Sequence, residues 1–436
     1  MTTGWLPLVL LVGIPFSGAA LGFVLWSKPR ALRVWALLVS LASLAGVAAL
    51  SGLPAGSFTG MTLLALLLPT AAFLSLLGQS PHEDNRAAWI MSLLLLGLGL
   101  GAMVSREGGE LILLALILVL VGVLIHRYRA MSVYHPWQGI GTCGVGVICI
   151  VMALVMPPPV SAVALVAVCA ILLPLVPFHG GHVAALAGLP GNLPAFLALL
   201  LPGLGFHGLL TLPGGMPEVA WTALGVLGLA GALYGSLKAV VQSRVRSLLA
   251  YANLSFFSIL WWYVAVAHTV PAQATTYVVS IGLATSGLLL AWHAIRARYG
   301  DIDLRAIRGL GRPMPRFALV FTLLALAALG LPPFGVFSGF MGMLLNPSLP
   351  VSGSLVVIIV TWLAASWYLL DLVQRLIFGR HRPELRYHDL RWAEMTSLLV
   401  IVVILTLLGI APARLFEPGA SVPQTRAQTE VISWNR

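Results

Sequence analysis

Charged residues are scarce in this sequence. Only 8% of its 436 residues are Asp, Glu, Lys or Arg, whereas 59% are hydrophobic, and the mean hydropathy is +1.00. Soluble globular domains carry about 25% charged residues. This scarcity excludes an ordinary soluble domain and indicates an integral membrane protein.

Cysteine and metal-ligand patterns are also scarce. The three cysteines, Cys143, Cys149 and Cys169, fall within apolar runs and lack metal-ligand spacing, so we interpret them as small hydrophobic residues. His179 and His182 are three residues apart, a spacing that suits a metal ion on a helix, but glycines surround them and no third ligand follows. The sequence therefore predicts no metal site.

Long apolar runs make up nearly the whole chain. Each is about 20 residues long, enough to cross the hydrocarbon core as a helix, and none alternates apolar with polar residues as a barrel strand does. The first run lacks a signal-peptide cleavage pattern, so we interpret it as a membrane helix. We predict an all-α integral membrane protein with about 14 transmembrane helices, over residues 5–27, 32–52, 59–78, 87–104, 109–126, 139–156, 159–175, 192–213, 219–242, 246–267, 275–297, 315–345, 352–378 and 393–412.

Basic residues are grouped between these runs. The net charge of +11 comes from short clusters that follow odd-numbered spans, and Arg106 is the exception. The positive-inside rule then places the odd loops in the cytoplasm and both termini outside. The same distribution explains the basic pI without a nucleic-acid partner.

Two apolar stretches contain helix breakers. Residues 328–341 read ALGLPPFGVFSGFM, and residues 177–194 read PFHGGHVAALAGLPGNLP. Broken helices within a membrane are tolerated inside protein or beside a water-filled cavity, and paired breaks are typical of inverted-repeat transporters. The residues predicted to break the helices are Pro177, Pro190, Pro194, Pro332, Pro333 and Gly335.

Few ionisable residues lie within the spans, where such groups usually mark function. The candidates for an ion path are Lys238, His207 and His293. Each also has a structural interpretation, because Lys238 can extend to the cytoplasmic surface and a histidine can be a hydrogen-bonded packing residue.

Other charged residues favour local roles. Asp371 and Arg375 are spaced for an ion pair on one helix, and Glu107 and Glu110 lie at a helix start, where the helix dipole favours acids.

Four stretches, in order along the chain, resemble one known family. They are residues 177–210, LYGSLKAVVQSRVRSLLAYANLS (233–255), DIDLRAIRGLGRPMP (301–315) and GLPPFGVFSGF (330–340). They resemble the antiporter-like membrane subunits of respiratory complex I, which are related to Mrp-type cation/proton antiporters and to membrane-bound hydrogenases. The resemblance implies two inverted five-helix repeats, each with a broken helix, and a charged axis at membrane mid-depth.

On this resemblance we divide the chain into four parts. N-terminal helices cover 1–86, the first repeat covers 87–242, the second covers 243–392, and a C-terminal helix and tail cover 393–436.

The charged axis of the family is reduced in this chain. Non-titratable residues stand where the family has charged ones: Phe340 for Lys or Glu, Gly203 for a lysine, Ser286 for a lysine, and apolar residues over 114–117 for a glutamate. The family's acid after the glutamine matches Arg244, while its lysine is matched by the basic Arg246, which joins the ion-path candidates. Because a lysine relay depends on coupled titrating groups, we expect a reduced or lost conduction axis.

The expected function is that of an antiporter-like subunit in a multi-subunit complex, involved in proton or Na⁺ translocation coupled to a partner's reaction. Two alternatives remain open: a non-conducting scaffold, and the membrane subunit of a CO₂ or bicarbonate uptake complex. The expected partners are other membrane and cytoplasmic subunits in a bacterial inner membrane. No sequence motif indicates a cofactor or a catalytic residue, so any NADH:quinone oxidoreductase-like or hydrogenase-like chemistry would belong to partners.

Overall fold

The chain folds into helices joined by short turns. A computed structural model describes residues 5–50, 60–79, 85–105, 108–129, 136–211, 217–300, 304, 307–345, 353–379 and 388–410, and within these ranges there is no strand. The helices are α1 (Trp5–Val24), α2 (Pro29–Leu50), α3 (Gly60–Leu77), α4 (Arg86–Val104), α5 (Gly109–Arg127), α6 (Pro136–Val155), α7 (Val160–Leu172), α8 (Gly180–Gly188), α9 (Leu193–Leu210), α10 (Glu218–Val240), α11 (Val245–Ala267), α12 (Ala272–Tyr299), α13 (Pro315–Leu329), α14 (Gly335–Leu344), α15 (Ser354–Ile377) and α16 (Trp392–Ile410).

The predicted all-α membrane class is confirmed. Among the described residues, 11 helices are long and apolar enough to cross a membrane. The count of 14 crossings stays a prediction. Most predicted spans differ from the observed helices by a few residues at their ends, whereas the span 315–345 is divided into α13 and α14.

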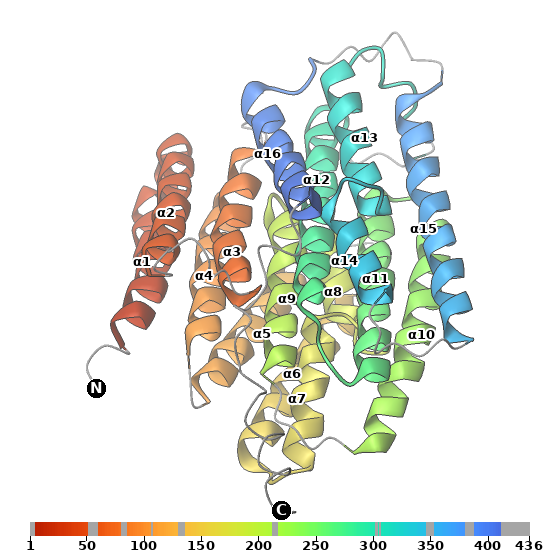
Figure 1. The fold of residues 1–436 in the computed structure, drawn as a ribbon. Helices are drawn as coiled ribbons and strands as arrows, with labels where there is room; N and C mark the ends of the chain where they lie inside the picture. Colours follow the sequence, from red (N-terminus) through yellow and green to blue (C-terminus); the bar gives the residue numbers. More distant parts are fainter. Residues whose placement is uncertain are drawn as a thin grey trace, which may run out of the picture.

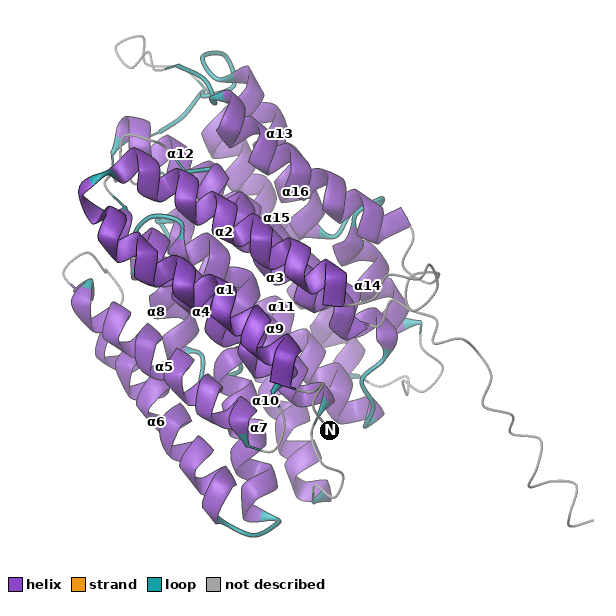
Figure 2. Cartoon of the chain, turned by 90° about the vertical axis from the view of Figure 1, so that its left-hand side faces the viewer, coloured by secondary structure: helices purple, strands orange, loops and turns teal. Residues whose placement is uncertain are grey.

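The helices form an elongated bundle with α11 and α12 at its centre. Both are almost wholly buried, whereas α1 and α2 lie at one side of the bundle and α10 and α15 at the other (Figure 1). Figure 2 shows α1, α2 and α4 running along one face of the bundle. The 28 residues of α12 extend about 42 Å, which exceeds the roughly 30 Å hydrocarbon core.

Glycines of α10 allow this helix to pack closely against α11. A Cβ atom at Gly228 of α10 would lie 2.6 Å from the backbone nitrogen of Trp262, and one at Gly235 would lie 2.7 Å from that of Ser255. Membrane helices pack closely where glycine or serine removes side-chain bulk. The glycine spacing in α10 therefore fixes its contact with α11.

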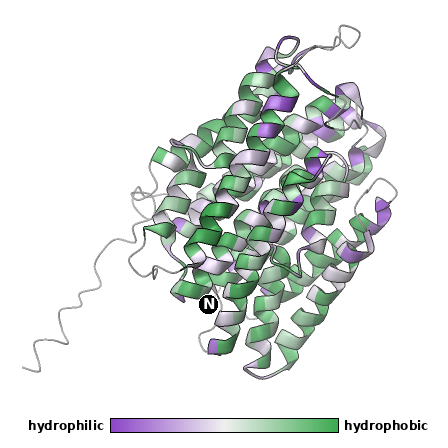
Figure 3. Cartoon of the chain, turned by 90° about the vertical axis from the view of Figure 1, so that its right-hand side faces the viewer, coloured by the Kyte–Doolittle hydropathy of each residue, from purple (hydrophilic) through white to green (hydrophobic). Residues whose placement is uncertain are grey.

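Basic residues gather at one end of the bundle. Every described lysine and arginine lies in or near the turns after α1, α3, α5, α10, α12 and α15, which meet at this end, and Figure 3 shows hydrophilic residues concentrated there. We refer to it as the basic end. The acids Glu110 and Glu218 start α5 and α10 at the opposite end.

A buried ion pair ties helices together at the basic end. Arg298 of α12 lies 2.6 Å from Glu394 of α16, and the Glu394 side chain is only 2% exposed. Asp389 accepts hydrogen bonds from the backbone N–H groups of Arg316 (2.8 Å) and Phe317 (3.1 Å) at the start of α13. These bonds satisfy donors that a helix start leaves open.

Candidate functional site: two interrupted helices

The first interruption lies between α7 and α8. Helix α7 ends at Leu172 and α8 begins at Gly180, so the turn includes Pro177. The backbone oxygen of Leu173 accepts a hydrogen bond from the indole nitrogen of Trp261 at 2.9 Å. Because lipid offers no partner for backbone polar groups, this side-chain donor helps α7 to end inside the bundle.

Arg246 of α11 holds the other end of α8. Its Nε donates to the backbone oxygen of Leu186 at 3.0 Å, and its Nη2 donates to that of Leu189. The last carbonyls of a helix lack partners within the helix, and a cation there also complements the helix dipole. The structure therefore gives this ion-path candidate a positioning role.

The predicted breaking residues around α8 take different places. Pro177 lies in the turn before α8 and Pro190 in the turn after it, whereas Pro194 lies in the first turn of α9. Proline suits a helix start, because its missing N–H is one of those without an intrahelical partner.

A buried polar chain connects α8, α11 and α12. The Asn253 amide nitrogen lies 3.4 Å from Nε2 of His182, and its amide oxygen accepts a hydrogen bond of 2.7 Å from the Thr285 hydroxyl. Because an amide N–H donates, Nε2 of His182 is the acceptor and the proton of the neutral ring lies on Nδ1. That Nδ1 has no hydrogen-bond partner among the described residues, and His182 is 1% exposed.

The sequence does not single out this polar chain. His182 stands out there for its spacing from His179, whereas Asn253 and Thr285 lie in apolar helical runs and carry no signal of their own. Thr285 precedes Ser286, which stands at a predicted lysine position. Neutral hydrogen-bonding groups thus lie next to a position where the resemblance implies a charge.

The second interruption separates α13 from α14. Gly330 has a φ of +76°, its N–H donates to Ala327, and the N–H of Leu331 donates to Leu326 at 3.2 Å. These bonds form a Schellman cap, which ends a helix. Pro332 and Pro333 follow between the helices, and Gly335 is the first residue of α14.

The second interruption faces the periphery. Leu331, Pro332 and Pro333 are exposed, while Phe334 is buried. Since α13 has 15 residues, the interruption lies about 22 Å from the basic end, within a hydrocarbon core of about 30 Å.

Aromatic rings occupy the position where the resemblance implies a Lys or Glu. Phe340 stacks on Trp362, with ring centroids 3.8 Å apart, and on Tyr277 at 6.3 Å. Trp362 also meets the edge of Phe256 at 5.5 Å. Phe340 is buried, so this part of the bundle is closed by apolar packing.

The predicted lysine position on α9 is closed in a similar way. A Cβ atom at Gly203 would lie 2.9 Å from a terminal methyl carbon of Leu64 on α3. A side chain there would have to displace Leu64, so the glycine serves helix packing.

His207 lies one turn beyond Gly203 and has an acidic neighbour. Its Nε2 lies 3.7 Å from a carboxyl oxygen of Glu110, and its Nδ1 lies 3.3 Å from the sulfur of Met61. A cavity of about 190 Å³ adjoins this pair and is lined by Gly108, Glu110, Leu111, Leu114, Leu165, Val168, Cys169, Gly208 and Thr211. The sequence predicted Glu110 only as a helix-start acid, and Glu107 lies outside the described residues.

Lys238 lies away from these groups. Its side chain is exposed on α10, and its Nζ lies 5.8 Å from the ring centre of Tyr234. Tyr234 in turn meets His179 edge to face at 5.4 Å. The structure thus places Lys238 on the flank of the bundle.

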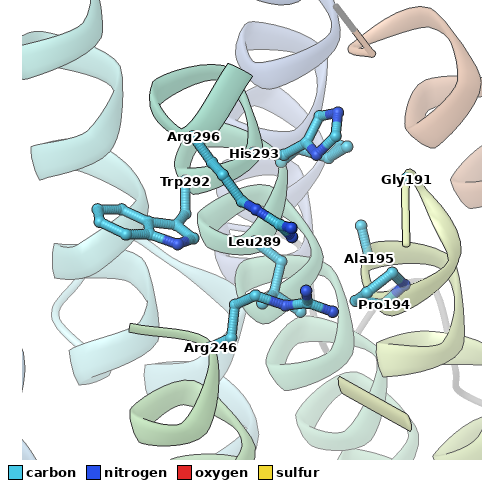
Figure 4. Close-up of a pocket in the computed structure, with 9 residues that line it drawn as sticks. Gly191, Pro194, Ala195, Arg246, Leu289, Trp292, His293 and Arg296 are labelled. Carbon is cyan, nitrogen blue, oxygen red and sulfur yellow. The ribbon is translucent and has the colours of Figure 1, made fainter. Parts of the chain in front are cut away.

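His293 lines a small pocket near the basic end. Arg246, Arg296, Pro194 and Ala195 line the same pocket, whose volume of about 10 Å³ is about that of one water molecule. Figure 4 shows Arg246 and Arg296 extending from α11 and α12 toward the same space. Of the four ion-path candidates, the structure brings together only Arg246 and His293.

Three further local features concern charged residues, thiols and possible metal ligands. Asp371 and Arg375 form the predicted ion pair at 2.8 Å, with both side chains substantially exposed. The three cysteines are free thiols. In the ranges that the structure describes, no cluster of three His, Cys, Asp or Glu residues could hold a metal ion.

Comparison with known proteins identifies related membrane subunits. Residues 159–366 match the family described as NADH:quinone oxidoreductase/Mrp antiporter, TM. The NADH-quinone oxidoreductase subunit M of Escherichia coli (strain K12) is 28% identical over 262 residues, which cover 58% of this chain and 51% of the relative. This chain therefore matches about half the length of that curated relative.

Solved structures extend the similarity in fold. A chain of respiratory complex I from Thermus thermophilus superposes with a TM-score of 0.77 at 21% identity, covering 93% of this chain and 96% of that one. A chain of the Mrp complex from Dietzia sp. DQ12-45-1b gives a TM-score of 0.76 at 17% identity, covering 94% and 95%. The match of residues 159–366 confirms the family resemblance predicted from the four sequence stretches, and the solved structures confirm the fold.

Proposed function

We propose, from the match of residues 159–366 to the family described as NADH:quinone oxidoreductase/Mrp antiporter, TM, that the chain is an antiporter-like subunit with a reduced conduction axis. It assembles with other membrane and cytoplasmic subunits in a bacterial inner membrane, with its basic end in the cytoplasm. The partners carry the chemical reaction.

The exposed second interruption is the observation that carries the multi-subunit proposal. Leu331, Pro332 and Pro333 form an irregular segment at membrane depth on the outside of the bundle. Irregular backbone at that depth occurs where protein or a wet cavity covers it, not against lipid. A neighbouring membrane subunit supplies this cover.

The reduced axis is supported by what fills the expected charged positions. Phe340 is stacked between rings and Gly203 faces Leu64. None of these groups can bind a proton near neutral pH. A continuous titrating path from one end to the other is therefore interrupted, and the polar groups that remain form separate clusters.

The same features bear on the two alternatives. The apolar closure around Phe340 favours a scaffold over a full channel. An inorganic-carbon uptake complex differs from a respiratory complex in the partner's chemistry, so partner identity separates the two.

Purification of the full chain from native membranes tests this proposal. A tag on the chain should retain stoichiometric membrane and cytoplasmic subunits in mild detergent. Cofactors or catalytic activity in those subunits then identify the complex as respiratory or carbon-concentrating. Recovery of a single polypeptide that transports a solute alone would contradict the proposal.

A further inference from the structure

We infer that Glu110 and His207 form a proton-binding site. The cavity beside it opens to the side of the membrane opposite the basic end and is closed at its inner end. The site joins two titratable groups from α5 and α9 beside a cavity of about 190 Å³. Its ligand is a single proton delivered by water. The inference depends on the proposed function only for the orientation of the bundle.

The cavity is exposed to solvent at its outer end and lined by buried, apolar side chains at its inner end. Thr211 at the end of α9 is exposed, and Gly108 before α5 is partly exposed. Leu114 and Cys169 are buried, with 3% and 4% exposure. Water can therefore enter between the ends of α5 and α9, while apolar side chains close the inner end.

The pair lies one helical turn from the positions implied by the resemblance. Those positions are Gly203 on α9 and residues 114–117 on α5. His207 and Glu110 are each at least four residues closer to the same end, about 6 Å along the helix axis. Because both partners are displaced in the same direction, they still meet, and the contact has moved toward the bundle end.

The immediate surroundings leave the pair to titrate together. Met61 contacts the other ring nitrogen of His207, and Cys169 from α7 is the further titratable side chain that lines the cavity within the described residues. No described lysine or arginine lies at this end. Two groups 3.7 Å apart in such a setting bind protons as a coupled unit.

The proton balance is simple. A Glu110 carboxylate beside a neutral His207 carries one negative charge. Uptake of one proton, either on the carboxyl group or on the imidazole, leaves the pair with no net charge. Partial burial favours this uncharged form because an unpaired charge is costly away from water.

Glu218 and His268 provide a matched control. They lie 3.9 Å apart at the same end of the bundle, at the start of α10 and just after the end of α11, but their side chains are 78% and 45% exposed. The residue types are the same, and this pair does not line the cavity.

A thiol introduced by Thr211→Cys, at the exposed end of the same cavity, reports on the charge of the site. We would remove the native thiols with Cys143→Ala, Cys149→Ala and Cys169→Ala and label the full chain in sealed membrane vesicles. Two small methanethiosulfonate reagents, one with an ammonium group and one with a sulfonate group, would be added from either side. Labelling should occur from the side opposite the basic end, and the preference for the ammonium reagent should fall by about tenfold from alkaline to acidic buffer.

Two variants test whether Glu110 causes the pH dependence of labelling. Glu110→Gln should abolish the pH dependence of this preference, whereas Glu218→Gln should preserve it. The inference is overturned if the introduced thiol reacts with neither reagent, if it reacts only from the basic side, or if Glu110→Gln keeps the same pH dependence. These outcomes leave the multi-subunit proposal standing, because no partner reaction is measured.

Infrared difference spectra provide a second measurement that needs no labelling. Difference spectra of the full chain in membranes at two pH values should contain a band of the protonated pair, from the carboxyl carbonyl or from the imidazolium ring, that is lost in Glu110→Gln. The same band in wild type and Glu110→Gln would contradict the inference.

Discussion

Phe340 and Trp362 stack face to face, with ring centroids 3.8 Å apart and ring planes 14° apart. The resemblance implies a Lys or Glu at position 340, beside the second interruption. At the position where the resemblance implies a group that could hold a proton, the stacked rings exclude water. On the function we propose, this contact distinguishes the chain from a subunit with a complete charged axis.

A lysine placed at this contact should destabilise the protein. Phe340→Lys would bury an ammonium group among aromatic rings, and an uncompensated buried charge costs about 3 kcal/mol or more. Phe340→Leu keeps the site apolar and should cost about 1 kcal/mol. Thermal unfolding in detergent compares the two variants, and equal stability of both would show that the site can accept charge.

Loss of Arg246 should loosen the first interruption. Arg246→Ala removes bonds to the carbonyl groups of Leu186 and Leu189, and each hydrogen bond to a charged group contributes about 1.5–3 kcal/mol. Arg375→Ala is the control, because it breaks only an exposed ion pair worth about 1 kcal/mol or less. Proteolysis near α8 should increase in the first variant only; unchanged cleavage would refute the positioning role.

The buried polar chain should behave as a coupled unit. Asn253→Ala and Thr285→Val each remove one side of a 2.7 Å hydrogen bond. A double-mutant cycle on unfolding free energy should give a coupling of about 1 kcal/mol. Thr322→Val, whose hydroxyl bonds within α13, should give a coupling near zero with Asn253→Ala. Additive effects of Asn253→Ala and Thr285→Val would show that the two side chains are not energetically coupled.

Periodicity and helix breakers account for most of the correct predictions. Continuous apolar runs predicted the helical membrane class, and Pro332 with Pro333 placed an interruption between 315 and 345 because proline cannot continue a helix. The sequence located the first interruption less accurately. Its glycines and prolines predicted one break over 177–194, whereas the structure places the short helix α8 within that stretch.

Contacts between distant helices were beyond sequence reasoning. Glu110 and His207 are 97 positions apart, and only the packing of α5 near α9 brings them together. Arg298 and Glu394 are 96 positions apart and form a buried pair only because α12 and α16 pack together. Arg246 was predicted from its match to a lysine, but its bonds to the end of α8 depend on how α11 packs.

A substitution of Lys238 tests whether this exposed residue of α10 takes part in ion transport. Its side chain is exposed on α10 and lies over Tyr234, so Lys238→Ala should change stability by less than about 0.5 kcal/mol. The activity of the assembled complex should also stay at the wild-type level. If the Lys238→Ala complex is stable but loses its ion-coupled activity, Lys238 belongs to the ion path and the prediction is wrong.

The number of ions moved per turnover tests the reduced axis most directly. The assembled complex would be reconstituted into sealed liposomes, and ion uptake would be measured against the partner's reaction for wild type, Glu110→Gln, His182→Gln and Lys238→Ala. Our account predicts the same ratio in all four, since no continuous titrating path runs through this chain. A ratio that falls by one ion or more in any stably assembled variant would contradict it.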